Sequence, residues 1–276
     1  VSDFYDEIKT NQGAQQVLFQ MTINKVFEKE YGSKVSDKEV DKELAKQKKQ
    51  LGNQFDAYLA QQGLTEETAK KQIRSNMLLE YAVSQAAKKD IKESDYKTAF
   101  ESYTPEVTAQ IIKLDSEDKA KEVLEAAKAE GADFAKIAKD NSTDTATKDK
   151  GGEVKFDSGT ADIPSQVKEA AFKLDENGIS DVITVSAGQN YSASYYIVKL
   201  NKKTEKGSDW KKYEKRLKEI IVDGRKQDTN YIRSVIAKAM TNANIKVKDD
   251  AFKSTFNQYL QNIGVETSDS SSSSKK

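Results

Sequence analysis

Residues 107–114 read Val107-Thr-Ala-Gln-Ile-Ile-Lys-Leu114, and this segment decides how the centre of the 276-residue chain folds. Apolar residues recur at alternate positions in much of it, which is the pattern of a half-buried strand. Thr104-Pro105 comes directly before the segment, and a proline ends a helix at or before its neighbour. The sequence therefore changes from helix to sheet at this point.

The segments that follow complete a unit of mixed helices and strands. Apolar residues at helical spacing predict three helices, near 117–130, 132–140 and 165–174. Two further β-rich segments predict strands at 181–185 and 194–200. The pair Gly151-Gly152 lies between the second and third of these helices and reads as a turn before a strand. Elements in this order predict a compact α+β unit.

Both flanks of this unit read as helix. Residues 10–100 are helical almost throughout, and Ser36-Asp-Lys-Glu39 has the capping-box pattern that satisfies first-turn amides. Thr65 and Ser94 are expected to begin further helices. Residues 209 to about 240 are helical again, and a last amphipathic helix is predicted from its apolar residues, Phe252, Phe256, Tyr259, Leu260 and Ile263. Neither flank can bury its narrow apolar stripes alone, so we expect the two to pack together.

The predicted fold class is therefore α+β, with this mixed unit inserted into an all-helical domain made from both ends of the chain. The predicted boundaries are 1–104 and 205–265 for the helical domain, 105–204 for the inserted domain, and 266–276 for a Ser/Lys tail. This tail is too polar to bury a core, so disorder is expected there.

Composition excludes several classes of function. The 45 basic and 45 acidic side chains balance, so no overall charge attracts nucleic acid or an anionic membrane. The sequence contains neither cysteine nor histidine, which removes thiol catalysis, disulfides and the usual transition-metal ligands. Its acidic residues lack the spacing of a calcium loop. We therefore expect no metal and no cofactor.

The central stretch resembles a parvulin-type prolyl isomerase domain. The resemblance is carried by Gly131-Ala-Asp-Phe-Ala-Lys-Ile-Ala-Lys-Asp140, Ser142-Thr-Asp144, Gly151-Gly152 and Tyr195-Tyr-Ile-Val-Lys-Leu200, in this order and spacing. It implies a twisted four-stranded antiparallel sheet flanked by helices, with a shallow site on the sheet. It also implies two histidines at that site, which this sequence lacks.

The resemblance assigns residues of this sequence to the parvulin site. The two histidine positions are occupied by Gln110 and Tyr196, and the acidic or thiol position by Asp144. These three residues form the predicted catalytic network. The proline-binding positions are occupied by Ile163, Val167 and Phe172, which are all apolar.

Prolyl isomerisation requires neither a nucleophile nor a cofactor. Amide resonance gives rotation about an X-Pro bond a barrier of ~18–20 kcal/mol. An apolar slot must hold the proline ring, and polar groups must favour the twisted amide over the planar one. Gln110 and Tyr196 can donate hydrogen bonds, although neither titrates near neutrality as histidine does. The sequence leaves two alternatives open: a weak isomerase, or a binding domain without catalysis.

The whole arrangement resembles the PrsA foldases of Gram-positive bacteria, and within them the streptococcal proteinase maturation proteins. This resemblance implies an extracytoplasmic chaperone that assists the folding of exported polypeptides and contacts their proline-containing segments. It also implies a lipid anchor on the outer face of the cell membrane. Because this sequence has no cysteine, such an anchor would lie upstream of Val1. A homodimer is a further expectation.

A chaperone of this kind needs exposed apolar or aromatic groups on its helical flanks. The candidates in this sequence are Tyr58, Phe100, Tyr103 and Tyr213. A third interpretation of the chain is a surface interaction or adhesion module without foldase activity. Only the expected exterior location and the solvated charges favour it.

Overall fold

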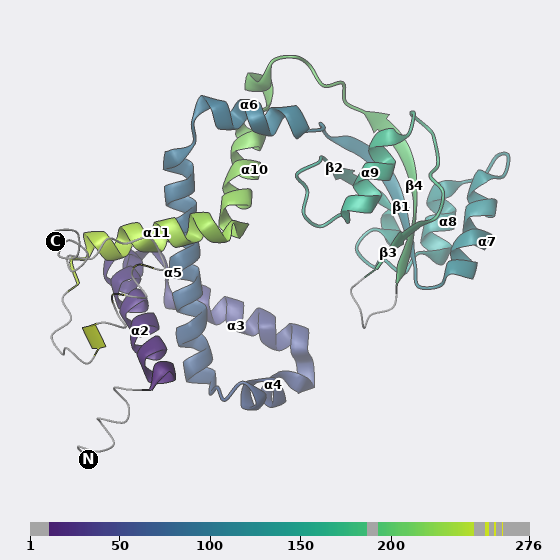
Figure 1. Cartoon of the computed structure of the whole chain (residues 1–276). Helices are drawn as coiled ribbons and strands as arrows, with labels where there is room; N and C mark the ends of the chain where they lie inside the picture. Colours follow the sequence, from purple (N-terminus) through teal and green to yellow (C-terminus); the bar gives the residue numbers. More distant parts are fainter. Residues whose placement is uncertain (1–10, 187–192, 246–251, 254–256, 258–260, 262–276) are drawn as a thin grey trace, which may run out of the picture. The chain divides into compact units, whose positions relative to one another are not determined.

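The computed structural model describes residues 11–186 and 193–245, together with residues 252, 253, 257 and 261 (Figure 1). The chain divides into two compact units, one formed by Glu93–Leu217 and the other by Val1–Lys92 with Lys218–Lys276. The predicted C-terminal helix falls mostly outside the described residues, although Phe252 is helical. The predicted tail at 266–276 lies entirely outside them.

The unit of residues 93–217 is built on a four-stranded antiparallel sheet, as expected. Its strands are β1 (Val107–Leu114), β2 (Glu153–Phe156), β3 (Ile183–Val185) and β4 (Ser194–Lys203), in the order β2-β1-β4-β3. The two long strands β1 and β4 lie at the centre, where Lys113 faces Tyr196 and Gln110 faces Lys199. The register shifts once, between Thr108 and Ala109, so the pairing is regular from Ala109 onward.

Helices cover both faces of this sheet (Figure 1). α7 (Glu117–Lys128) and α8 (Phe134–Asn141) pack on one face, against Ile112, Leu114 and Ile197. α9 (Ser165–Lys173) packs on the other, where Val167 and Ala171 contact the apolar side chains of β1 and β4. Successive side chains of a strand point to opposite faces, so alternate residues of β1 are divided between these two cores.

Two helical segments beside the sheet belong to the same unit. α6 (Glu93–Ser102) stacks Tyr96 on Trp210 of the 3₁₀ helix η4 (Trp210–Tyr213), with ring centroids 5.0 Å apart. Phe100 likewise stacks on Tyr213 at 5.7 Å. The unit accordingly runs from 93 to 217, whereas the sequence patterns placed the borders of the inserted domain at 105 and 204. Ring pairing between segments a hundred residues apart leaves no local pattern, so these patterns did not reveal it.

The other unit is helical. Its elements are α2 (Gln12–Tyr31), η1 (Gly32–Lys34), α3 (Asp37–Leu51), η2 (Gly52–Gln54), α4 (Phe55–Gln61), α5 (Glu66–Asp90) and α11 (Thr229–Asn242), with the part of α10 (Glu214–Gln227) that follows Leu217. Side chains from both ends of the chain share its core, which joins Phe27, Leu44 and Leu78 to Met240. The predicted packing of the two flanks against each other is therefore present.

Helix starts agree with the sequence at two positions and differ at a third. Ser36 forms the predicted capping box with Glu39, and Thr65 caps α5. Ser94 does not begin α6, because that helix already includes Glu93. The helix predicted from 209 to about 240 is interrupted at Asp228, whose carboxylate caps α11.

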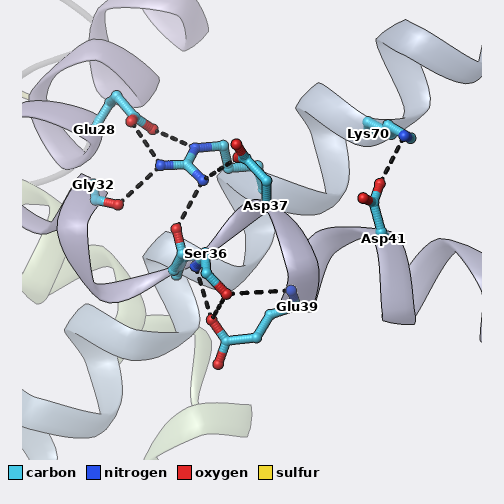
Figure 2. Close-up of polar contacts among 9 residues, drawn as sticks. Glu28, Gly32, Ser36, Asp37, Glu39, Asp41 and Lys70 are labelled. Carbon is cyan, nitrogen blue, oxygen red and sulfur yellow. Dashed lines mark hydrogen bonds and ion pairs between the residues drawn. The ribbon is translucent and has the colours of Figure 1, made fainter.

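Arg74 of α5 fixes the connection between α2 and α3. Its guanidinium pairs with Glu28 at 2.9 Å and donates to the carbonyls of Gly32 and Val35 at 2.9 and 2.8 Å. Figure 2 shows Glu28, Gly32 and Asp37 around this group, with the Ser36–Glu39 capping box below. One charged side chain thus binds two carbonyls of the turn between the helices and fixes its course.

Across the described part of the chain, every helix is too short or too polar to cross a membrane.

Candidate functional site

An apolar cluster lies on the face of the sheet that α9 packs against, and we call its three residues assigned to proline binding the candidate slot. Ile163, Val167 and Phe172 pack in one cluster with Phe156 of β2 and Tyr196 of β4. Val167 is fully buried, while Ile163 and Phe172 are partly exposed. The rings of Phe156 and Phe172 lie 5.8 Å apart at 52°. The structure therefore brings together the three residues that the sequence assigned to proline binding.

Local contacts place α9 beside this slot. Pro164 precedes the helix, and its carbonyl accepts the first helical hydrogen bond from Lys168. The Lys168 ammonium donates to the carbonyls of Ser158 and Thr160, at 3.0 and 2.6 Å. These bonds tie α9 to the turn that follows β2, so Ile163 is held at the start of the helix.

Tyr196 forms the polar side of the slot. It lies on β4 between Lys113 of β1 and Ile183 of β3, and its side chain is half-buried. Burial raises the pKa of Tyr196, and the negative charges of Asp144 and Asp115 raise it further. The phenol consequently stays protonated at neutral pH and remains able to donate a hydrogen bond.

Asp144 is held by the loop that follows α8. The neighbouring Thr143 donates its backbone N–H to the carbonyl of Lys113, at 2.8 Å. The Asp144 carboxylate accepts hydrogen bonds from the Thr147 hydroxyl at 2.5 Å and from the backbone of Ala146 at 3.1 Å. Lys113 is the register partner of Tyr196, so these contacts place the carboxylate near the Tyr196 phenol.

Gln110 does not join this group. Its neighbours Ala109 and Ile111 belong to the cluster that contains Tyr196, so Gln110 points to the opposite face of the sheet. There its side-chain amide donates to the carbonyl of Gly151, at 2.9 Å. Of the three polar residues predicted for the site, the structure brings together Asp144 and Tyr196, and it places Gln110 beneath the loop that carries Asp144.

The Gly151-Gly152 pair lets this loop lie directly on the sheet. Both residues have positive φ, +68° and +79°, which residues other than glycine rarely adopt. A Cβ on Gly152 would lie 2.4 Å from the carbonyl oxygen of Ile111, and one on Gly151 would lie 2.7 Å from Cβ of Ala135. The sequence suggested a simple turn here, but the close approach also requires glycine.

A buried charged group that the sequence did not indicate lies near the end of β2. The Asp157 carboxylate accepts from the Nε and Nη2 atoms of Arg216, at 2.6 and 2.8 Å, and from the Tyr103 hydroxyl at 3.1 Å. Burial alone would raise the pKa of Asp157, but the hydrogen bonds and charge of Arg216 hold it below its usual range. This group fastens the end of α6 and the start of α10 to the sheet.

The aromatic residues predicted to contact unfolded segments differ in exposure. Tyr58 on α4 is 45% exposed. Phe100 and Tyr213 are half-buried because they stack on each other, and Tyr103 is buried beside them. The described residues also expose Val17, Leu18 and Met21 on α2, which the sequence did not single out.

The chemistry of the site is that of binding and hydrogen bonding. An apolar slot can hold a proline ring, and a protonated phenol beside a carboxylate can bind a twisted amide. Within the described residues, no group of three acidic side chains is placed to hold a metal ion. The rotation needs no such ion, because no bond is broken.

Comparison with known proteins gives a consistent result. A family model described as "Rotamase: PPIC-type PPIASE domain" matches residues 104–202. A "Foldase protein PrsA" from Streptococcus sanguinis is 60% identical over 96% of this chain and 78% of its own length. The corresponding protein of Streptococcus gordonii is 58% identical over 100% of this chain and 87% of its own length.

Solved structures agree with the fold. The crystal structure of foldase protein PrsA from Streptococcus pneumoniae is 54% identical, with a TM-score of 0.81, and the match covers 93% of this chain and 94% of that one. The foldase protein PrsA from Lactococcus lactis is 36% identical with a TM-score of 0.73, and the match covers 94% of each chain.

Proposed function

Because this chain belongs to the PrsA family of foldase proteins, we propose that it assists the folding of exported polypeptides outside the cytoplasm. Its parvulin-type domain contacts their proline-containing segments and accelerates isomerisation weakly or not at all. The helical unit holds unfolded segments through exposed apolar groups and so lowers their free concentration and their aggregation.

One observation supports this proposal most directly. Ile163, Val167 and Phe172 pack in one apolar cluster with Tyr196, whose pKa is raised in part by the charge of Asp144, while imidazole is absent from the whole sequence. A slot without its usual imidazoles favours binding over catalysis. Losing one hydrogen-bond donor to a transition state commonly costs ~2.7–4 kcal/mol, which is a factor of 10²–10³ in rate.

The domain assignment and cellular location are part of the proposal. We assign proline binding to the sheet unit of residues 93–217, which contains the segment 105–204, and retention of clients to the helical unit. Location on the outer face of the membrane of a Gram-positive bacterium through a lipid anchor, and assembly as a homodimer, follow the family and stay predictions. Nothing in the described residues favours the alternative of an adhesion module, and we do not propose it.

The test combines two assays on the intact chain. We expect it to suppress aggregation of a chemically denatured exported protein at near-stoichiometric amounts. In a proline-peptide isomerisation assay we expect little or no acceleration, and we expect Tyr196→His to raise the rate because it places an imidazole beside Asp144. Lys199→His is the matched control, since Lys199 lies on the same strand and points to the other face.

Two results would contradict the proposal. A chain that neither suppresses aggregation nor binds proline peptides cannot be a foldase of this kind. A rate as high with the unaltered chain as with Tyr196→His would show that the missing imidazole does not limit catalysis.

A further inference from the structure

We propose that Gln110 is a positioning residue, which holds the loop of residues 143–152 on the sheet and thereby places Asp144 beside Tyr196. This inference rests on the proposed function, because it concerns the same proline-binding site. It differs from the role that sequence resemblance implies, in which Gln110 would itself contact the substrate amide.

The first step of the argument is the face on which Gln110 lies. Ala109 and Ile111 belong to the cluster with Tyr196 and Val167, whereas Ile112 and Leu114 belong to the cluster beneath α7 and α8. The pairing of β1 with β4 is regular from Ala109 onward, so Gln110 shares the second face. Its amide therefore cannot reach a proline held in the slot.

The second step is the bond that Gln110 makes. Its Nε2 atom donates to the carbonyl of Gly151 at 2.9 Å, and the next residue, Ile111, donates its backbone N–H to the carbonyl of Gly152 at 2.8 Å. A side chain and a main chain on adjacent residues of β1 thus bind two successive carbonyls of the loop. Both glycines pack too closely for a Cβ, so the loop is in direct contact with β1 and α8.

The third step connects this anchor to Asp144. The backbone N–H of Gly152 donates to the carbonyl of Thr147 at 3.0 Å, and that of Lys148 donates to the carbonyl of Asp144 at 2.9 Å. The Thr147 hydroxyl binds the Asp144 carboxylate itself. Hydrogen bonds joined through Gly151, Gly152 and Thr147 therefore connect Gln110 to the Asp144 carboxylate, whose charge acts on Tyr196.

The experiment uses the intact chain and does not depend on catalysis. Gln110→Leu retains a similar volume but loses the donor, and Gln110→His retains an N–H donor of comparable reach. Gln166→Leu is the matched control, because Gln166 is exposed on α9 and its side-chain oxygen accepts from the Ser165 hydroxyl. In each protein, NMR measures the amide shifts of residues 143–152 and the pKa of Tyr196. The Tyr196 resonance is assigned by its absence from the spectrum of Tyr196→Phe.

With Gln110→Leu we expect shifts concentrated at 143–152 and a lower pKa for Tyr196, because Asp144 moves away from the phenol. Gln110→His should keep both readouts close to those of the unaltered chain and should not raise any isomerase rate. The inference is overturned if Gln110→Leu leaves the loop shifts and the Tyr196 pKa unchanged, or if Gln110→His alone accelerates isomerisation.

A loss of thermal stability without a change in the Tyr196 pKa would also contradict it, since that would indicate a merely structural residue. These readouts are separate from the test of the proposed function. Failure of the aggregation assay would leave the NMR result standing, and failure of the NMR result would leave the foldase assignment standing.

Discussion

Replacing Arg216 by methionine should destabilise the unit of residues 93–217 by about 3 kcal/mol. Removing one partner of a buried ion pair costs roughly 3–5 kcal/mol, because the other charge stays buried and uncompensated. The Asp157 side chain is 8% exposed and that of Arg216 is 33% exposed, so the lower end of that range applies. The bonds that Asp157 accepts from Tyr103 and Thr160 remain and offset part of the loss.

Urea unfolding measured by tryptophan fluorescence is the direct assay. Trp210 is the only tryptophan in the sequence and stacks on Tyr96 within the same unit, so its emission follows the unfolding of this unit. With a denaturant dependence of ~1–3 kcal/mol per molar urea, the midpoint should fall by on the order of 1–3 M. Lys136→Met is the control, because Lys136 pairs with Asp140 at the surface and its loss should leave the midpoint unchanged.

The pH dependence has a defined sign. In the unaltered chain the pKa of Asp157 is lowered, so its contribution to stability is present above the unfolded pKa and lost as pH falls through the folded one. Without Arg216, burial dominates and raises the pKa of Asp157. The buried charge then destabilises the variant at neutral pH and disappears in acid. The difference in stability between the two proteins should therefore narrow as pH is lowered from 7 toward about 4.

The reasoning about this ion pair would be refuted by a midpoint for Arg216→Met equal to that of the Lys136→Met control. The same reasoning would be refuted if the double variant Arg216→Met with Asp157→Asn lost as much free energy of unfolding as the two single variants lose together. Removing both charges should recover part of the loss, and the double-mutant cycle measures that coupling.

Three other substitutions test the packing of the loops and helix starts. Gly152→Ala should lower the urea midpoint more than Gly131→Ala. Both glycines have positive φ, which costs a residue with a Cβ ~1–2 kcal/mol, but only Gly152 lies at close range to a carbonyl of β1. Arg74→Met should destabilise the helical unit by about 2 kcal/mol, because two backbone carbonyls lose a charged donor; circular dichroism measures it. Ser36→Ala should lower the free energy of unfolding by about 1 kcal/mol in the same measurement, because α3 loses its N-cap. Stability equal to that of the unaltered chain would show that the cap contributes nothing.

Local patterns in the sequence predicted what local interactions determine. The capping box at Ser36 depends on residues three apart, and the structure contains it. The strands β1 and β4 were predicted from their β-rich segments, and α9 from its apolar spacing. The slot residues Ile163, Val167 and Phe172 were assigned by resemblance, and they do pack together.

The orientation of Gln110 could not be obtained in the same way. A match of sequence text assigns a position on a strand, but whether Gln110 and Tyr196 share a face depends on how β1 pairs with β4. Tyr196 pairs with Lys113, which is three residues from Gln110, and side chains an odd number of residues apart on a strand point to opposite faces. The likeness to a histidine position therefore gave the right strand without showing what the side chain contacts.

The Asp157–Arg216 pair was not predicted because its members are 59 residues apart. Asp157-Ser-Gly after a strand reads as a turn, and Asp157 does accept from the backbone of Gly159. Nothing local indicates that this carboxylate also binds the first turn of α10. The stacking of Tyr96 on Trp210 was missed for the same reason.

The central claim is that a proline ring binds the slot beside Tyr196 although the imidazoles are absent. Amide and methyl NMR shifts of the intact chain, titrated with a short proline peptide and with the same peptide bearing alanine instead, test it most directly. We predict saturable shifts at Ile163, Val167, Phe172 and Tyr196 with the proline peptide alone. Shifts confined to the face beneath α7 and α8, or equal shifts with the alanine peptide, would contradict the claim.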